Sequence, residues 1–261
     1  MNKIGDFKYF TFGLRLEWIE LFLKNGIEVL VCSTLGPKQK EALYYYLKDM
    51  ELIVNRKETT AFYDMVSLIY EKKGIYSVNL WSFLWINLYF NSLLFSWYGT
   101  IPLGRHNRKE VLKAMTDSYK KINTSVISGY TSLVGTLEKT PIGKELRIGM
   151  VVKEGAQRTT YKEGNFKFHP VVVLYTLYKY IENEKNLRNS KIELKMIEEM
   201  TYSPQKVLVL SSEQVKNSIL SLYEPEFFSV ISSEDKFIIE LNPNKKALDI
   251  INLFLRREKI I

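Results

Sequence analysis

An uncharged stretch from Gly74 to Gly104 constrains the fold of this sequence more than any other feature. Its apolar centre, IYSVNLWSFLWINLYFNSLLFSWYG, is long enough to cross a bilayer, which takes about 20 residues. Three asparagines and four serines in this stretch would each need a hydrogen-bond partner in lipid, whereas helices packed in a protein interior satisfy such groups locally. We therefore expect apolar, aromatic core helices over residues 76–103 rather than a membrane span.

The single cysteine, Cys32, excludes an intrachain disulfide. Its neighbours, IEVLVC, are typical of a buried strand or helix end, so we expect the thiol to be buried. The first residues include Asp6 and lack a long apolar segment, which argues against a signal peptide. These features together favour a cytoplasmic protein that binds no membrane.

Residues 1–75 have the order helix, helix, hairpin. Apolar residues of the first helix recur at the spacing of a core-facing stripe: Leu14, Trp18, Ile19, Leu21 and Phe22. Pro37 suits the first position of a second helix, which we expect to run to about Met50. The following ELIVNRKETTAF predicts two short strands around a tight turn. This order predicts a winged-helix-like unit.

Three consecutive tyrosines lie in that second helix. At 100° per residue, Tyr46 shares its face with apolar residues and is predicted to be core. The opposite face carries Lys38, Glu41, Tyr44, Tyr45 and Lys48. Exposed tyrosines beside lysines are typical of protein interfaces and also of base-stacking surfaces. We favour a partner protein for this face and keep DNA as the alternative.

Positive charge is concentrated in the middle of the chain. Residues 104–162 hold 12 Lys and Arg against 5 Asp and Glu, whereas residues 1–103 hold 11 against 10 and residues 163–261 hold 14 against 14. Nearly all of the net charge of +8 therefore belongs to the middle segment. Such a local excess is expected of a phosphate-binding surface, although a solvated basic face without a partner remains the alternative.

Residues 104–165 repeat the winged-helix-like pattern in a basic form. Asn107 and Glu110 have the spacing of a capping box at the start of a helix over residues 107–121. A second helix follows, with Ile127 and Tyr130 on its inward face and Thr136 on its outward face. Residues 146–164 predict a hairpin that turns near EGAQ. The expected DNA-binding residues are Arg105, His106, Arg108, Lys109, Ser125, Ser128, Thr131, Ser132, Arg147, Lys153, Arg158 and Lys162.

Residues 166–261 alternate helix and strand with balanced charge, which predicts a third winged-helix-like unit for docking. HPVVVLYTLYKYIENE predicts a helix whose aliphatic start could equally be a strand. We expect SKIELKMIEEM to be a helix, KVLVL a strand, and SSEQVKNSILSLY a helix opened by Ser211 or Ser212. FFSVI and KFIIEL predict a hairpin, and NKKALDIINLFLRR a closing helix.

Catalytic chemistry finds little support in the sequence. Two histidines, His106 and His169, and one cysteine cannot form a zinc site of the usual spacing. Phosphate-binding glycine loops, nucleophile elbows and the H-E-x-x-H motif are absent from the sequence. We therefore predict no catalytic residue, no metal and no cofactor.

Three stretches together resemble one family. TFGLRLEW (11–18), LGPKQKEALYYYLKDMELI (35–53) and LWSFLWINLYFNSLLFSWYG (80–99) are similar, in order and spacing, to an uncharacterised bacterial family. Genes of that family lie beside phosphoadenosine-phosphosulfate-reductase-like and DNA-phosphorothioation genes in phage-defence clusters. The resemblance implies a DNA-modification or defence context and assigns no catalytic residue.

The sequence thus predicts a mainly helical α+β protein, built of consecutive winged-helix-like units around a central aromatic helical core. Its expected role is that of a non-enzymatic DNA-binding accessory or regulator in a DNA-modification or defence system. Double-stranded DNA and a protein of the same system are the expected partners, and a homodimer is left open. The alternative is a scaffold subunit that touches no DNA.

Overall fold

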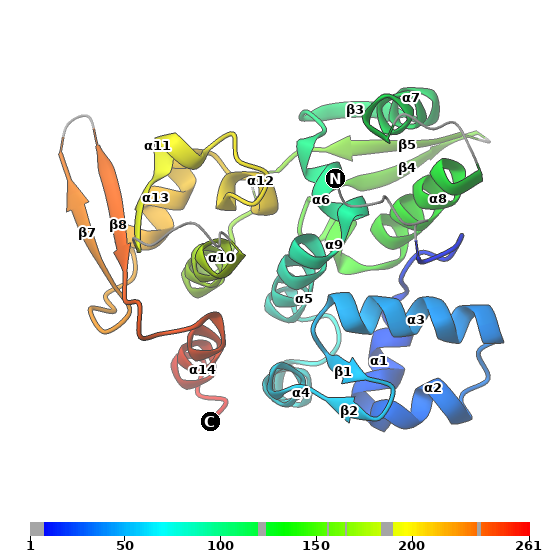
Figure 1. The fold of residues 1–261 in the computed structure, drawn as a ribbon, viewed down its shortest axis with the longest axis horizontal. Coiled ribbons are helices and arrows are strands. Elements are labelled where there is room, and N and C mark those ends of the chain that lie inside the picture. The colour runs from blue at the N-terminus through cyan, green and yellow to red at the C-terminus, as the bar shows by residue number, and fades with distance from the viewer. Residues whose placement is uncertain (1–7, 120–123, 156, 165, 184–189, 234–235) are drawn as a thin grey trace. The chain divides into compact units, whose positions relative to one another are not determined.

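The computed structural model describes residues 8–119, 124–155, 157–164, 166–183, 190–233 and 236–261. The protein is α+β and mainly helical, with three small antiparallel sheets among these residues. Two compact units divide the chain (Figure 1). The first comprises residues up to Phe95 together with Ile101–Gly164, and the second comprises Ser96–Thr100 together with Asn165–Ile261.

The first unit begins with short helices and a small hairpin. Its helical elements are α1 (Leu16–Asn25), the 3-10 turn η1 (Gly26–Glu28), α2 (Val29–Cys32), α3 (Pro37–Asp49) and α4 (Ala61–Lys73). Strands β1 (Ile53–Asn55) and β2 (Glu58–Thr59) pair antiparallel between α3 and α4, which confirms the expected hairpin. Pro37 occupies the first turn of α3, and the Gln39 side chain accepts a hydrogen bond from the Gly36 N–H at 3.0 Å.

Helix α5 (Val78–Asn91) is the core of this unit, as the uncharged stretch predicts. Every residue of α5 from Leu80 to Phe90 is buried. Its polar groups bind the backbone of α3: Asn87 Nδ2 donates to Met50 O at 3.2 Å, and Asn91 Nδ2 donates to Asp49 O at 3.1 Å. Helix α6 (Leu93–Thr100) follows after a short break. In the described parts of the chain, each helix is too short or too polar to span a membrane.

The segment before α1 lies directly against helix α8 (Thr124–Lys139). A Cβ atom built on Gly13 would lie 2.3 Å from the carbonyl carbon of Gly135, so the two backbones touch. Leu14 N donates to Thr136 Oγ1 at 2.9 Å, and Ser132 Oγ donates to Phe10 O at 2.8 Å. Ser132 and Thr136 are therefore fully buried, and their expected outward position is wrong.

Tyr46 confirms its predicted core position on α3. Its ring stacks on Tyr9 at a centroid distance of 4.1 Å, and its hydroxyl donates to Phe12 O at 3.0 Å. The Tyr9 hydroxyl in turn donates to the Asp49 carboxylate, which also pairs with Lys8 at 2.6 Å. Burial raises the pKa of the Asp49 carboxyl, while Lys8 opposes that shift. This pairing lets a carboxylate lie inside the core.

A three-stranded sheet closes the first unit, in the order β3-β5-β4. Its strands are β3 (Gly104–Asn107), β4 (Met150–Glu154) and β5 (Gln157–Lys162), and helices α7 (Arg108–Tyr119), α8 and α9 (Pro141–Lys144) accompany them. The hairpin β4–β5 was expected, but β3 was not, because one glycine followed by three polar residues shows no strand periodicity. The expected capping box is confirmed, since Asn107 N donates to Glu110 Oε2 at 2.9 Å and Glu110 N to Asn107 Oδ1 at 3.0 Å.

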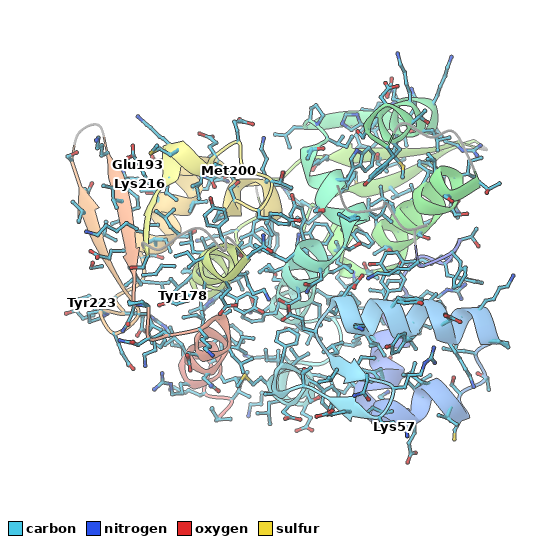
Figure 2. All side chains as sticks on the ribbon, in the orientation of Figure 1. Lys57, Tyr178, Glu193, Met200, Lys216 and Tyr223 are labelled. Atoms are coloured by element: carbon cyan, nitrogen blue, oxygen red, sulfur yellow. The ribbon has the colours of Figure 1, made fainter. Side chains whose placement is uncertain are left out.

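The second unit surrounds α10 (Pro170–Asn183), which is a helix throughout. Tyr178 on α10 is buried, and its hydroxyl donates to Phe227 O at 2.6 Å (Figure 2). Helices α12, α13 and α14 pack against α10, and the sheet has the order β6-β8-β7. The remaining bounds are β6 (Lys191–Glu193), α11 (Leu194–Ile197), α12 (Pro204–Leu208), α13 (Ser212–Leu220), β7 (Phe228–Ser232), β8 (Phe237–Leu241) and α14 (Ala247–Arg257).

Two expectations for the second unit are wrong and three are confirmed. KVLVL is mostly helix α12, because Ser203 caps it and Pro204 begins it, which overrides the β-branched pattern. SKIELKMIEEM begins as strand β6, which pairs with β8, and only then becomes helix α11. The hairpin β7–β8, the closing helix α14 and the helix α13 agree with expectation, and Ser211 is the cap of α13.

Two further side chains differ from expectation. Cys32 is exposed at the end of the four-residue helix α2, where its short helix offers no second layer to cover it. Ile127, expected inward, is 48 % exposed near the start of α8. In both cases the apolar pattern near a helix end predicts burial that the helix end does not provide.

The contact between Gly13 and Gly135 predicts a large effect of one methyl group. Gly13→Ala should lower the free energy of unfolding by about 3 kcal/mol, because its Cβ would meet backbone atoms that cannot move aside. Urea unfolding followed by tryptophan fluorescence measures this. Gly36→Ala is the matched control, since the nearest atom to its Cβ is 3.8 Å away, and it should cost less than about 1 kcal/mol. Equal losses in the two variants would contradict the close backbone contact.

Candidate nucleic-acid interface

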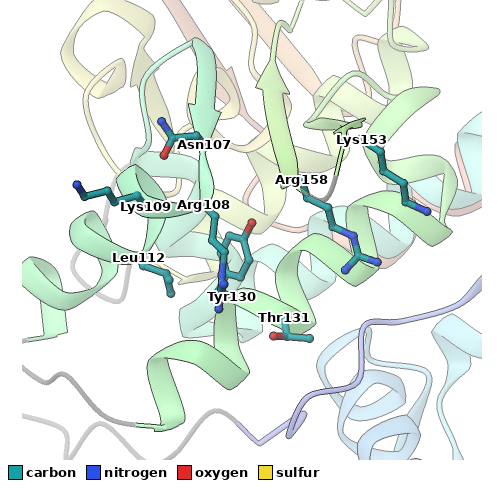
Figure 3. A pocket seen from close by; sticks show the side chains of 9 residues that line it. Asn107, Arg108, Lys109, Leu112, Tyr130, Thr131, Lys153 and Arg158 are labelled. Atoms are coloured by element: carbon teal, nitrogen blue, oxygen red, sulfur yellow. The ribbon is translucent and has the colours of Figure 1, made fainter.

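A cationic pocket lies in the first unit where α7, α8 and the β4–β5 hairpin meet (Figure 3). Its volume is about 680 Å³, which is within the usual range for small-ligand sites. The described lining residues are Asn107, Arg108, Lys109, Leu112, Tyr130, Thr131, Lys153, Gly155 and Arg158. Four of these nine carry a positive charge and none carries a negative one. We define these nine residues as the basic pocket.

The first turn of α7 supplies two of the four cations. Asn107 caps this helix, so Arg108 and Lys109 are held at its N-terminus, where the helix dipole favours anions. Both side chains are exposed, and within the described residues neither has a carboxylate partner. Their charge is therefore uncompensated and available to an anionic ligand.

The β4–β5 hairpin supplies the other two cations, and both pair with one carboxylate on α8. Lys153 Nζ lies 3.2 Å from Glu138 Oε1, and Arg158 Nη2 lies 3.3 Å from Glu138 Oε2. The Glu138 side chain is 19 % exposed, whereas those of Lys153 and Arg158 are 67 % and 43 % exposed. Glu138 thus holds two cations at the pocket wall while their outer surfaces remain open to solvent.

Tyr130 on α8 forms the inner wall of the basic pocket. Figure 3 shows its ring between the side chains of Arg108 and Arg158, and the Arg108 guanidinium lies 5.8 Å from the ring centroid. Burial raises the pKa of the Tyr130 hydroxyl, while the two guanidinium groups oppose that shift. The hydroxyl therefore stays protonated at neutral pH and is a hydrogen-bond donor.

The other expected DNA-binding residues lie outside the basic pocket. Arg105 on β3 pairs with Glu154, whose carboxyl pKa is lowered first by the Tyr161 hydroxyl and further by Thr159 and Arg105. His106 Nε2 lies 2.8 Å from Pro102 O. Five further expected residues neither line the pocket nor lie on β3: Ser125, Ser128, Ser132, Arg147 and Lys162.

Two expected DNA-binding residues are not exposed. Ser132 is fully buried against Phe10, as described above. Lys162 is 3 % exposed, and its ammonium donates to Ile101 O at 2.7 Å. Arg158 and Lys162 are four residues apart on β5 and share a face by strand alternation, but Arg158 lies near the β4–β5 turn and is exposed, whereas Lys162 lies at the other end of the strand beside Ile101. Both expectations of exposure are therefore wrong.

The face expected to bind a protein partner has internal contacts of its own. Tyr44 and Tyr45 are half-buried and pack edge to face at 5.4 Å. The guanidinium of Arg56 lies 4.4 Å from the Tyr44 ring centroid, and the Lys8 ammonium lies 5.8 Å from that of Tyr45. Glu41 is half-buried, and Lys38 and Lys48 are exposed.

Sequence reasoning missed Tyr130 and Glu138. Tyr130 was placed correctly on the inward face of its helix, but its polar tip was not considered. A tyrosine among inward aliphatic residues needs a partner for its hydroxyl, and that requirement was the available signal. Glu138 had no such signal, because its two cations lie on strands 15 and 20 residues away.

Comparison with known proteins shows that the fold of this chain is similar to that of solved structures. No family model and no curated protein matches the sequence. A magnesium-ion-bound SspB crystal structure superposes with a TM-score of 0.74 at 12 % identity, over 98 % of this chain and 88 % of that one. A further SspB crystal structure gives 0.72 at 12 % identity, with the same coverage. The chain shares its fold with SspB.

Because that SspB structure binds a magnesium ion, the positions of possible metal ligands in this chain are relevant. Among the described residues, histidine, cysteine, aspartate and glutamate side chains do not gather in groups of three or more. Glu138, beside the basic pocket, is already paired with two cations.

Because Lys162 is buried and Lys153 is exposed, replacing Lys162 should lower the free energy of unfolding more than replacing Lys153. Lys162→Ala should lower the free energy of unfolding by about 2 kcal/mol, because it removes a buried charged hydrogen bond to Ile101 O. Lys153→Ala removes an exposed ion pair and should cost less than about 1 kcal/mol. Thermal or urea unfolding of the two variants measures the difference, and a reversed order would contradict the assignment of Lys162 to the core.

Proposed function

We propose that this protein is a non-enzymatic, DNA-binding accessory protein of a DNA-modification system, and that the basic pocket is its contact with the phosphate backbone. The observation that carries the proposal is the arrangement of four cations around a pocket whose described lining contains no acidic residue. Lysine and arginine side chains that neutralise phosphates release counterions, and this release drives DNA binding.

The order of elements from β3 to β5 supports a winged-helix interpretation of this part of the chain. Strand β3 precedes α7 and α8, and the β4–β5 hairpin follows them and pairs with β3 through β5. In a winged helix, a helix enters the DNA groove and the hairpin follows the backbone. On this interpretation Thr131 and the first turn of α7 approach the DNA, while Lys153 and Arg158 on the hairpin contact phosphates.

The DNA-modification context rests on two independent resemblances. Three sequence stretches resemble a family encoded beside DNA-phosphorothioation genes, and the fold is that of SspB, which is consistent with a protein of such a system. A resemblance of this kind supports the context of the function, whereas the basic pocket supports its chemistry.

A scaffold role is the second candidate, and the face around Tyr44 and Tyr45 favours it. Half-buried tyrosines flanked by Arg56 and Lys48 form a surface of the composition common in protein interfaces. The two candidates differ in which surface matters for DNA. Replacing Tyr44 and Tyr45 with alanine should leave DNA affinity almost unchanged and weaken binding of a partner protein.

Salt dependence of duplex binding tests the proposed function. The triple variant Arg108→Ala, Lys153→Ala and Arg158→Ala should lower the slope of log affinity against log salt by about three units, because each side chain neutralises about one phosphate. Fluorescence anisotropy with a short labelled duplex at several salt concentrations measures the slope.

A charge-matched control separates this pocket from overall charge. Lys195, Lys236 and Arg256 are exposed in the second unit, and their replacement by alanine removes the same three positive charges. That variant should keep the slope of the unsubstituted protein. If the control variant loses as much as the pocket variant, or if the unsubstituted protein binds no duplex at low salt, the proposed function is wrong.

A further inference from the structure

The Tyr130 hydroxyl is a donor at the wall of the basic pocket that has no hydrogen-bond partner within the described residues. Tyr130 is 6 % exposed and lines the pocket, and its hydroxyl oxygen is not among the buried atoms that lack a partner, so it is reached from the pocket. A donor in this position is available to a ligand. Two other buried tyrosines use their hydroxyls inside the protein: Tyr46 donates to Phe12 O, and Tyr178 donates to Phe227 O.

The surroundings of this hydroxyl are cationic on both sides. The Arg108 guanidinium lies 5.8 Å from the Tyr130 ring centroid, and Arg158 lines the same pocket. Arg108 has no carboxylate partner among the described residues. Arg158 contacts Glu138 through Nη2, and the remaining N–H groups of its five are available to a ligand. Tyr130, Arg108 and Arg158 therefore bring three sets of donors to the lining of the same basic pocket (Figure 3).

We propose that the Tyr130 hydroxyl, together with Arg108 and Arg158, binds a single phosphate group inside the basic pocket. A phosphate presents several oxygen acceptors and at least one negative charge, so it accepts from the hydroxyl and from both guanidinium groups at once. A neutral ligand would leave the charge of Arg108 uncompensated, and a cation would be repelled.

The size of the pocket extends this inference. A volume of about 680 Å³ exceeds what one phosphate fills, so the sugar and base attached to that phosphate also fit. The site therefore takes a nucleotide phosphate, which belongs either to the end of a strand or to its interior. This inference rests on the proposed function for its ligand class, but its chemistry is independent of duplex binding.

Tyr130→Phe tests the phosphate site because it removes the hydroxyl alone. Affinity for inorganic phosphate and for thymidine 5′-monophosphate, measured by calorimetry on the full chain, should fall about tenfold, the loss expected for one hydrogen bond to a charged acceptor. Stability should stay the same or rise, because the hydroxyl has no partner in the folded chain. A clear loss of stability instead would assign the hydroxyl a structural role and overturn the inference.

Tyr161→Phe, on strand β5, is the matched control. It removes a hydroxyl that donates to Glu154 Oε1 at 3.1 Å, outside the basic pocket, and should leave phosphate affinity unchanged. If Tyr130→Phe binds both probes as tightly as the unsubstituted protein does, or if the unsubstituted protein binds neither probe at millimolar concentrations, the inference is wrong.

The source of the phosphate is decided with short single strands that carry or lack a 5′-phosphate. Equal binding of the two strands assigns the site to an internal phosphodiester, and preference for the phosphorylated strand assigns it to a strand end; in both cases Tyr130→Phe should weaken the binding. Failure here is distinguishable from failure of the proposed function. If duplex binding persists in Tyr130→Phe but is lost in the triple pocket variant, only the inference about Tyr130 is contradicted. If the protein binds phosphate but no duplex, the proposal that DNA is the partner is contradicted.

Discussion

The backbone contact between Gly13 and Gly135 is the constraint on which the geometry of the first unit depends. It brings the segment before α1 against the middle of α8, and hydrogen bonds from Leu14 and Ser132 fix its register. The same α8 carries Tyr130 and Glu138, which set the inner wall and one edge of the basic pocket. Residues near the N-terminus therefore determine the position of a site that they do not touch.

Charge in the basic pocket is arranged so that the fold tolerates it. Four cations within one pocket repel one another, and the protein offsets this by pairing two of them with Glu138. The other two lie in the first turn of α7, where the peptide dipoles disfavour positive charge. Arg108 is thus held in an unfavourable place for its own stability, which is common for residues that are positioned for a ligand.

Much of the secondary structure could be predicted because it depends on local patterns. The capping box of Asn107 and Glu110, the Pro37 start of α3 and the aromatic core of α5 all agree with their sequence signals. Strand β3 could not be predicted, since its pairing with β5 joins residues more than 50 positions apart.

Burial of polar side chains was harder to predict, for the same reason. Ser132 looks like an outward serine on a helical wheel, and only the segment at Phe10, 122 residues away, turns that face into core. Lys162 looks like a wing residue until Ile101 supplies a buried acceptor for its ammonium. Of the candidate site, the cations could be predicted from composition, whereas Tyr130 and Glu138 required the tertiary arrangement.

The shared carboxylate of Glu138 gives the basic pocket an internal competitor. A ligand that binds Lys153 and Arg158 must compete with the Glu138 carboxylate, which already contacts both side chains. A small acid with one charge offers those two cations no more than Glu138 does, whereas a polyanion engages Arg108 and Lys109 at the same time. On the proposed function, this pairing favours a phosphate polymer over a singly charged small anion.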